Sequence, residues 1–165
     1  MHQEALQRLR DAKALSEAMG FDEYSDSPYL LRLLGLELLL KFVFESVLKR
    51  PAWGHKYEDF FCALPFDLQA RILYVAGARI GPSALASSHK SVFQDWGQNF
   101  VALRYPWERY ENLSEQQYSK VGEDWVGNGA PLDEAIFRYH PEEMRGVLEA
   151  LRCVAKELAN PVPKS

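Results

Sequence analysis

The sequence predicts an all-α fold, organised as an antiparallel up-and-down bundle of about four to six helices. Apolar residues recur at spacings of three and four along most of the chain, which is the period of an amphipathic helix. No segment alternates apolar and polar residues in the way a half-buried strand does. The connections between the periodic segments are short, and short connections place neighbouring helices antiparallel.

The length and composition of the chain indicate how many domains it forms and what kind of surface it has. The chain has 165 residues, of which 47% are hydrophobic and 25% charged, so we expect one domain over residues 1–165. A chain of this length buries enough surface to fold without disulfides or metals. Its net charge of −4 argues against a broadly basic surface for duplex DNA but permits a small local basic site.

The first two helices are expected over Gln3–Met19 and Ser27–Lys49. Gly20 ends the first. Ser27 is expected to cap the second, with Pro28 in its first turn. Leucines and phenylalanines cover most of the circumference of the second helix, which indicates a central helix packed on several sides.

The third helix is expected to open at His55, to break at Pro65 and to continue to Gly81. The fourth spans Ser83–Arg104, with an apolar face that includes Trp96 and Phe100, both expected in the core.

The last third of the chain gives a weaker pattern. Residues 110–130 are polar and predict a loop or a weakly helical excursion, and Pro131–Tyr139 could form a short helix. Pro141 opens the last helix, since acids follow it at the positive helix end. Its predicted apolar face comprises Met144, Val147, Leu148, Leu151, Val154 and Leu158.

The cysteines and the apolar segments indicate in which cellular compartment the protein is expected. Cys62 and Cys153 lie in apolar stretches without Cys or His at metal-ligand spacing, so we expect two reduced core thiols, no metal and no cofactor. The first residues lack the apolar region of a signal peptide. The apolar stretch Tyr29–Leu48 carries four charges and predicts a buried helix instead of a membrane span. These features favour a cytoplasmic protein that does not enter a membrane.

Glu37, Lys41 and Glu45 form a polar stripe on the otherwise apolar second helix. Charges on a central helix are costly unless they are paired. Arg104, at the end of the fourth helix, is a plausible partner for Glu37. We favour a structural Glu37–Arg104 network over a role for Glu37 in orienting His55.

The densest positive cluster lies where the second helix ends and the third begins. Arg50 and His55 are flanked there by Lys49 and Lys56. A helix N-terminus suits a phosphate, and an arginine can hold a phosphate oxygen bidentately. Two interpretations stay open: His55 and Arg50 form a catalytic pair with the lysines binding nucleic acid, or His55 caps the helix and Arg50 makes an ordinary ion pair.

At these residues the sequence resembles the HEPN superfamily of small helical-bundle proteins, over roughly residues 5–160. The short motifs that carry the resemblance occur in order along the chain: Leu36-Glu37-Leu38-Leu39-Leu40-Lys41, Gly54-His55-Lys56-Tyr57-Glu58-Asp59-Phe60-Phe61, Ala63-Leu64-Pro65 with Gln69, and Phe100-Val101 to Arg104-Tyr105-Pro106-Trp107-Glu108.

The resemblance implies a helical bundle that is often dimeric. Its catalytic members are metal-independent ribonucleases that use an Arg and a His separated by about four to six residues. Many are toxins or parts of antiviral defence or RNA-processing systems. Arg50 and His55 fit this pattern, and Tyr57 extends it to a form in which a partner enzyme modifies the tyrosine of a toxin. Pro51 departs from the pattern, as does the position of the pair across a turn.

The first hypothesis is therefore a HEPN-type endoribonuclease. His55 takes a proton from a ribose 2′-hydroxyl and Arg50 stabilises the phosphate. A homodimer would supply a second His55 as the acid, and partners would include RNA and possible antitoxins. The alternative is a non-catalytic HEPN module that binds a partner protein, a nucleotide or RNA.

Overall fold

A computed structural model describes residues 1–20, 25–105, 111–131, 135 and 137–160. The described residues form seven helices and no strand, which confirms the all-α class. The helices are α1 His2–Ala18, α2 Ser27–Leu48, α3 Tyr57–Cys62, α4 Phe66–Ile80, α5 Ala84–Arg104, α7 Glu115–Gly127 and α8 Pro141–Ala159. None of the described helices is long and apolar enough to cross a lipid bilayer.

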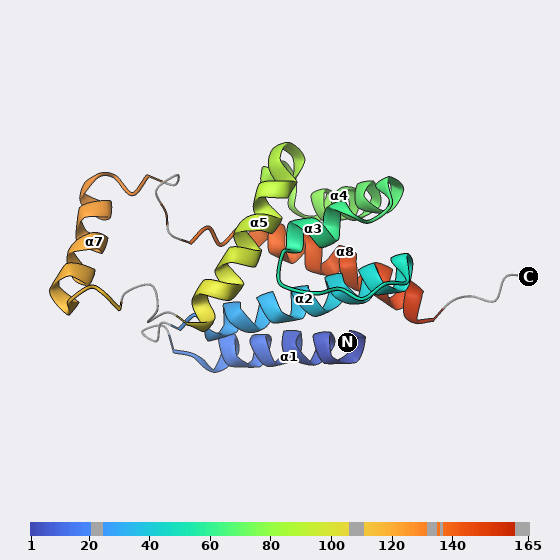
Figure 1. Ribbon diagram of the computed structural model, residues 1–165, viewed down its shortest axis with the longest axis horizontal. Coiled ribbons are helices and arrows are strands. Elements are labelled where there is room, and N and C mark those ends of the chain that lie inside the picture. Colours follow the sequence, from blue (N-terminus) through green and yellow to red (C-terminus); the bar gives the residue numbers. More distant parts are fainter. Residues whose placement is uncertain (21–24, 106–110, 132–134, 136, 161–165) are drawn as a thin grey trace, which may run out of the picture.

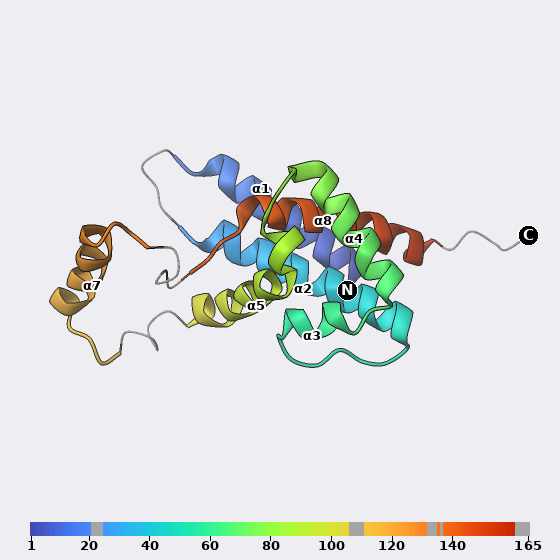
Figure 2. The same cartoon turned by 90° about the horizontal axis from the view of Figure 1, so that it is seen from above.

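The helices pack around α2, as its apolar circumference predicts. α1 lies along α2, α4 lies along α8, and α8 also contacts α2. Figures 1 and 2 show α5 running obliquely across this group, with α3 beside it, so the helices are not all aligned with one axis. The largest fully buried side chains come from α2, α3, α4, α5 and α8 and include Leu33, Leu36, Leu39, Leu40, Val43, Tyr57, Phe61, Ile72, Val92, Phe93, Trp96 and Leu151.

The helix starts differ from prediction in two places. Asp26, and not Ser27, occupies the position before α2, and its side chain makes no capping hydrogen bond. The hydroxyl of Ser25 accepts a hydrogen bond from the backbone N–H of Ser27 at 3.1 Å. The expected third helix is two helices, because the residue before Pro65 disfavours helical backbone. Together with α7, this division raises the number of described helices above the expected range.

The fourth predicted helix starts and ends where expected, and Ser83 caps it through its side chain. It is bent at Ser88, whose φ of −155° and ψ of 37° interrupt the helical backbone. Two adjacent serines stand at this point, and such pairs are a common cause of kinks.

α7 stands away from the other helices in both ribbon views (Figures 1 and 2) and contains no buried residue. The short helix expected over Pro131–Tyr139 falls partly outside the described residues, and those that are described there are not helical. The predicted core face of the last helix is confirmed: Met144, Val147, Leu148, Leu151 and Val154 are buried, and Leu158 packs at its edge.

Both cysteines are exposed, so the expectation of two core thiols is wrong. Cys62 ends α3, where the chain turns towards α4. Cys153 lies between Glu149 and Lys156 in the sequence and lines the same surface groove as they do. Apolar neighbours in the sequence do not bury a residue that the helical period turns outward.

Candidate functional site

The candidate site centres on Glu37, whose residue surface is only 4% exposed within the central helix. One carboxylate oxygen, Oε2, lies 2.8 Å from His55 Nδ1. The other, Oε1, lies 2.9 Å from Lys41 Nζ. The lysine therefore balances the buried charge, and the carboxylate fixes the orientation of the imidazole.

Glu45, the third member of the polar stripe, also binds the connection that follows α2. Glu45 Oε1 accepts a hydrogen bond from the backbone N–H of Ala52 at 3.0 Å. Figure 1 shows the connection from α2 to α3 running back along α2. Two carboxylates of α2 thus bind this connection at two points, Ala52 and His55.

The same connection approaches α5 closely at Gly97. A Cβ atom at this position would stand 2.7 Å from the carbonyl oxygen of His55. Glycine is therefore required for the connection to lie between α2 and α5 in this way. The ring of His55 lies 5.3 Å from the ring of Phe100, which follows one turn later on α5.

The second ring nitrogen of His55, Nε2, has no hydrogen-bond partner among the described residues, and the side chain is 36% exposed. The imidazole opens onto a groove of about 650 Å³. The groove is lined by His55, Lys56, Glu58, Gln94, Gly97, Gln98, Val101 and Ala102. An anion or a hydroxyl group could reach Nε2 here, with Lys56 nearby.

Arg50 does not join His55 in this groove. Its side chain is exposed, and its guanidinium carbon lies 5.0 Å from the centre of the Phe44 ring. Phe44 follows Glu37 by seven residues, which is about 10 Å along a helix. The two members of the predicted pair therefore contact different stretches of α2.

The expected helix-terminal position of His55 is also wrong. α3 begins at Tyr57, so His55 belongs to the connection before it. Of the two flanking lysines, Lys56 lines the groove, and Lys49 is the exposed residue that ends α2 with a left-handed φ of 55°. The predicted positive cluster is thus spread along the connection.

Arg104 does not pair with Glu37, so the favoured network is wrong and the less favoured role, orienting His55, is the one in the structure. The guanidinium lies 4.6 Å from the centre of the Phe100 ring and 5.6 Å from that of Tyr105. Its Nε is buried and lacks a hydrogen-bond partner within the described part of the chain. Spacing explains the outcome, because Phe100 lies one turn before Arg104 on the same helix.

Tyr57 is fully buried and donates a hydrogen bond from its hydroxyl to the carbonyl oxygen of Leu33, at 3.1 Å. Burial, together with the charge of Glu37, raises the pKa of Tyr57. The hydroxyl is thus enclosed, and a modifying enzyme could not reach it without opening the fold.

A second carboxylate–imidazole pair was not predicted. His140 Nε2 lies 2.8 Å from Asp95 Oδ2 and connects α5 to the residue before α8. The two residues are 45 positions apart, so no local spacing could have indicated the pair. His2 and His89 contact aromatic rings, those of Phe42 and Phe61.

No cluster of three or more metal-ligating side chains occurs in the residues described. Comparison of the chain with family models, with curated proteins and with solved structures returned no match, so its site is interpreted from its own residues.

Proposed function

We propose that this chain is a cytoplasmic interaction module with a HEPN-like helical bundle. In this proposal the Glu37–His55 pair has a structural role: it holds the connection between α2 and α3 against α2, and we call this pair the clasp. The proposal depends on one observation, which is that the charged residues of the polar stripe act together on the connection between α2 and α3. Glu37 and Glu45 both bind the connection after α2, and Lys41 balances the charge of Glu37. Arg50, the expected catalytic partner, contacts Phe44 instead.

An exposed apolar stripe on α4 supports an interaction role. Phe66 and Tyr74 are 84% and 78% exposed. Ala70 and Ala78, at the same four-residue spacing, are exposed as well. The opposite face of α4 packs in the core through Ile72 and Ala76. Aromatic side chains exposed in a row are typical of surfaces that contact another protein.

The clasp is tested with His55→Ala. Removal of the imidazole leaves a buried carboxylate oxygen without its donor, so we expect the free energy of unfolding to fall by about 1–3 kcal/mol. Urea denaturation measures this change. His89→Ala is the control, since that ring contacts Phe61 and its loss leaves no buried carboxylate unpaired.

The same preparations are incubated with RNA in EDTA. We expect wild type and His55→Ala to cleave no more RNA than a buffer blank. RNA cleavage that disappears in His55→Ala while stability is unchanged would overturn the clasp proposal.

A second candidate, the HEPN-type endoribonuclease, is favoured by one observation: His55 Nε2 has no hydrogen-bond partner in the described part of the chain and opens onto the groove beside Lys56. In that function, Nε2 takes the 2′-hydroxyl proton and the 2′-oxygen attacks the adjacent phosphorus. The bond to the 5′-oxygen then breaks, leaving a cyclic phosphate, and an acid protonates the leaving oxygen. A homodimer would have to supply that acid, and Arg50 could contribute only from the second copy.

The nuclease candidate makes its own prediction for Arg50. If a second copy supplies Arg50, Arg50→Ala and His55→Ala should both reduce cleavage by about 10²-fold or more, the scale of a lost catalytic group. Equal cleavage by wild type and both variants would reject this candidate.

A further inference from the structure

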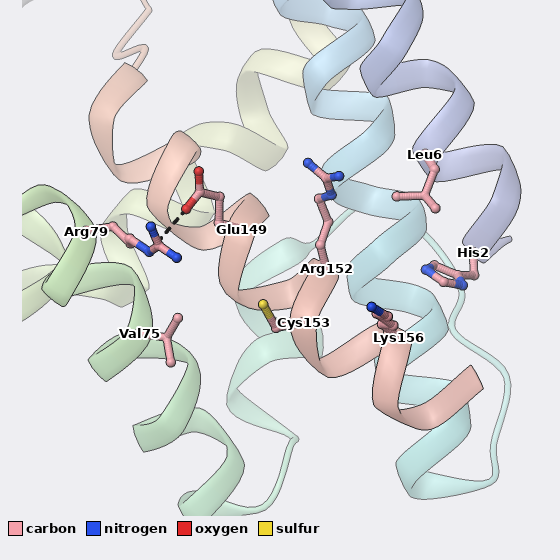
Figure 3. A pocket seen from close by; sticks show the side chains of 8 residues that line it. All are labelled: His2, Leu6, Val75, Arg79, Glu149, Arg152, Cys153 and Lys156. Carbon is pink, nitrogen blue, oxygen red and sulfur yellow. Dashed lines mark ion pairs between the residues drawn. The ribbon is translucent and has the colours of Figure 1, made fainter. Parts of the chain in front are cut away.

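One side of α8 lines a long surface groove, which we call the α8 groove. One part of it, of about 410 Å³, lies between α1, α2 and α8. The other part, of about 400 Å³, lies between α1, α4 and α8 (Figure 3), and the two parts share Glu149 and Arg152. α1 and α8 both pack against α2 but do not pack along each other, so a groove remains between them. The lining residues of α8 run from Pro141 to Lys156, a length of about 22 Å.

Aliphatic side chains from three helices line the α8 groove: Leu6, Leu9, Val75, Met144 and Leu148. The two aromatic rings among its lining residues already contact rings of the same chain. Tyr29 packs edge-on against Tyr139, and His2 stacks on Phe42. Single-stranded nucleic acids stack their bases on aromatic side chains, so this lining favours an aliphatic partner over RNA.

The charged residues along the α8 groove are almost all basic. The lining residues include one acid, Glu149, and six cations: Lys13, Arg32, Arg79, Arg145, Arg152 and Lys156. The chain as a whole has a net charge of −4, so most of its acids lie elsewhere. An acidic chain with one strongly basic groove favours a negatively charged partner for that groove.

Three of these cations have no ion-pair partner within the described part of the chain: Arg145, Arg152 and Lys156. The other three contact polar groups of the chain, which are Glu17 for Lys13, Ser16 for Arg32 and Glu149 for Arg79. The three unpaired cations are exposed and follow one another on α8 at spacings of seven and four residues. These spacings place them in one row along the helix.

We propose that the α8 groove binds an acidic amphipathic helix of a partner protein. The apolar stripe of that helix packs on the aliphatic lining, and its carboxylates bind the row formed by Arg145, Arg152 and Lys156. A helix of about 15 residues matches the length of the α8 wall. The inference rests on the proposed interaction function and names a class of partner, on a surface that shares no residue with the α4 stripe.

A fluorescein-labelled model peptide tests the proposal by fluorescence anisotropy with the full chain. The peptide has about 16 residues, with leucines spaced three and four apart, glutamates beside them and alanines elsewhere. Its control has glutamine in place of every glutamate, which keeps the helix propensity and the apolar stripe. We expect the acidic peptide to bind with a Kd below about 100 µM, and the glutamine peptide to bind at least about tenfold more weakly.

Charge reversal on α8 tests whether the row of cations is responsible. Arg145→Glu/Arg152→Glu should weaken binding of the acidic peptide at least about tenfold. Both side chains are exposed, so the helical fold should be retained, and circular dichroism checks this. Lys49→Glu/Lys90→Glu is the matched control: it makes the same change in net charge at two exposed positions outside the groove and should bind as wild type does.

Cys153 reports whether the peptide lies in the groove, because its thiol is exposed and lines it. With the acidic peptide at about ten times its Kd, alkylation of Cys153 by iodoacetamide should slow about tenfold, since only the free chain reacts. Cys62 is the internal control, because it is exposed at the end of α3 and does not line the groove. Mass spectrometry measures the alkylation of each cysteine.

The proposal requires all three results, and the absence of any one overturns it. Peptide binding that survives the reversal and leaves Cys153 unprotected would place the contact elsewhere, such as the α4 stripe, and would leave the proposed interaction function standing. A labelled single-stranded RNA that binds more tightly than the peptide, and is lost in Arg145→Glu/Arg152→Glu, would assign the groove to nucleic acid and overturn the proposal. The clasp is judged separately, by the unfolding of His55→Ala.

Discussion

The carboxylate of Glu37 illustrates how one buried charge organises its neighbours. It has Lys41 one turn further along the helix and His55 from a later segment, and both ion-pair distances are below 3 Å. A buried carboxylate without these contacts would be strongly destabilising. Its two partners explain why a charged residue is tolerated in the most apolar helix of the chain.

Tyr57, next to this carboxylate, gives a pH-dependent prediction. Its raised pKa means that the hydroxyl stays neutral in the folded chain at a pH where the unfolded chain has begun to ionise it. The contribution to stability is complete below pH about 10, the unfolded value, and is lost as the pH rises towards the folded value.

Tyr57→Phe should therefore lower the free energy of unfolding by about 0.5–1.5 kcal/mol near neutral pH, since a hydrogen bond is lost. Between pH 9 and about 11, we expect stability to fall less steeply in the variant than in wild type. Urea denaturation across this range measures both slopes, with the exposed Tyr74→Phe as control. Parallel slopes for wild type and Tyr57→Phe would contradict the prediction.

At the scale of elements, the connection from α2 to α3 is held from two sides. α2 provides the carboxylates that bind Ala52 and His55, and α5 approaches at Gly97. The polar stripe thus holds the connection against α2. The helical pattern of the sequence does not by itself indicate this role.

Gly97→Ala tests this close approach. The new Cβ would meet the His55 carbonyl oxygen at 2.7 Å, so the connection must shift. We expect a loss of about 1–3 kcal/mol in the free energy of unfolding. Gly77→Ala is a matched control, because Gly77 also lies inside a helix and nothing stands within 4 Å of its added Cβ. That change should stabilise the chain by about 0.5–1 kcal/mol. Equal effects of the two substitutions would argue against the tight contact.

At the scale of the whole molecule, α2 holds the fold together while α7 adds nothing to the core. The buried cluster joins side chains of α1, α2, α3, α4, α5 and α8. None of the residues of α7 is buried, so this helix contributes no side chain to that cluster.

The contribution of this core to the free energy of unfolding can be tested with two neighbouring leucines on α2. Leu39 is fully buried and Leu38 only partly. Leu39→Ala should lower the free energy of unfolding by about 2–5 kcal/mol, and Leu38→Ala by about 1 kcal/mol. Thermal unfolding followed by circular dichroism compares the two variants. A larger loss for Leu38→Ala would mean that α2 faces the core differently.

The local pattern of the chain determined its helices. Leucines and phenylalanines identified α2, and the spacing of methionine, valine and leucine identified α8. Gly20, Pro65 and Gly81 marked ends or breaks close to where the helices stop. Such features depend on residues within one or two turns of each other, which is the range over which periodicity and backbone restrictions act. The stripe on α2 was visible for the same reason.

Only the tertiary structure decided which groups meet. Glu37 binds His55 and not Arg104, Arg50 contacts Phe44, and both cysteines are exposed. Each outcome depends on the path of the connection after α2 and on how the helices are rotated about their axes. The spacing of residues in the sequence does not reveal this path or these rotations, because a contact between distant segments follows from the packing of the whole chain.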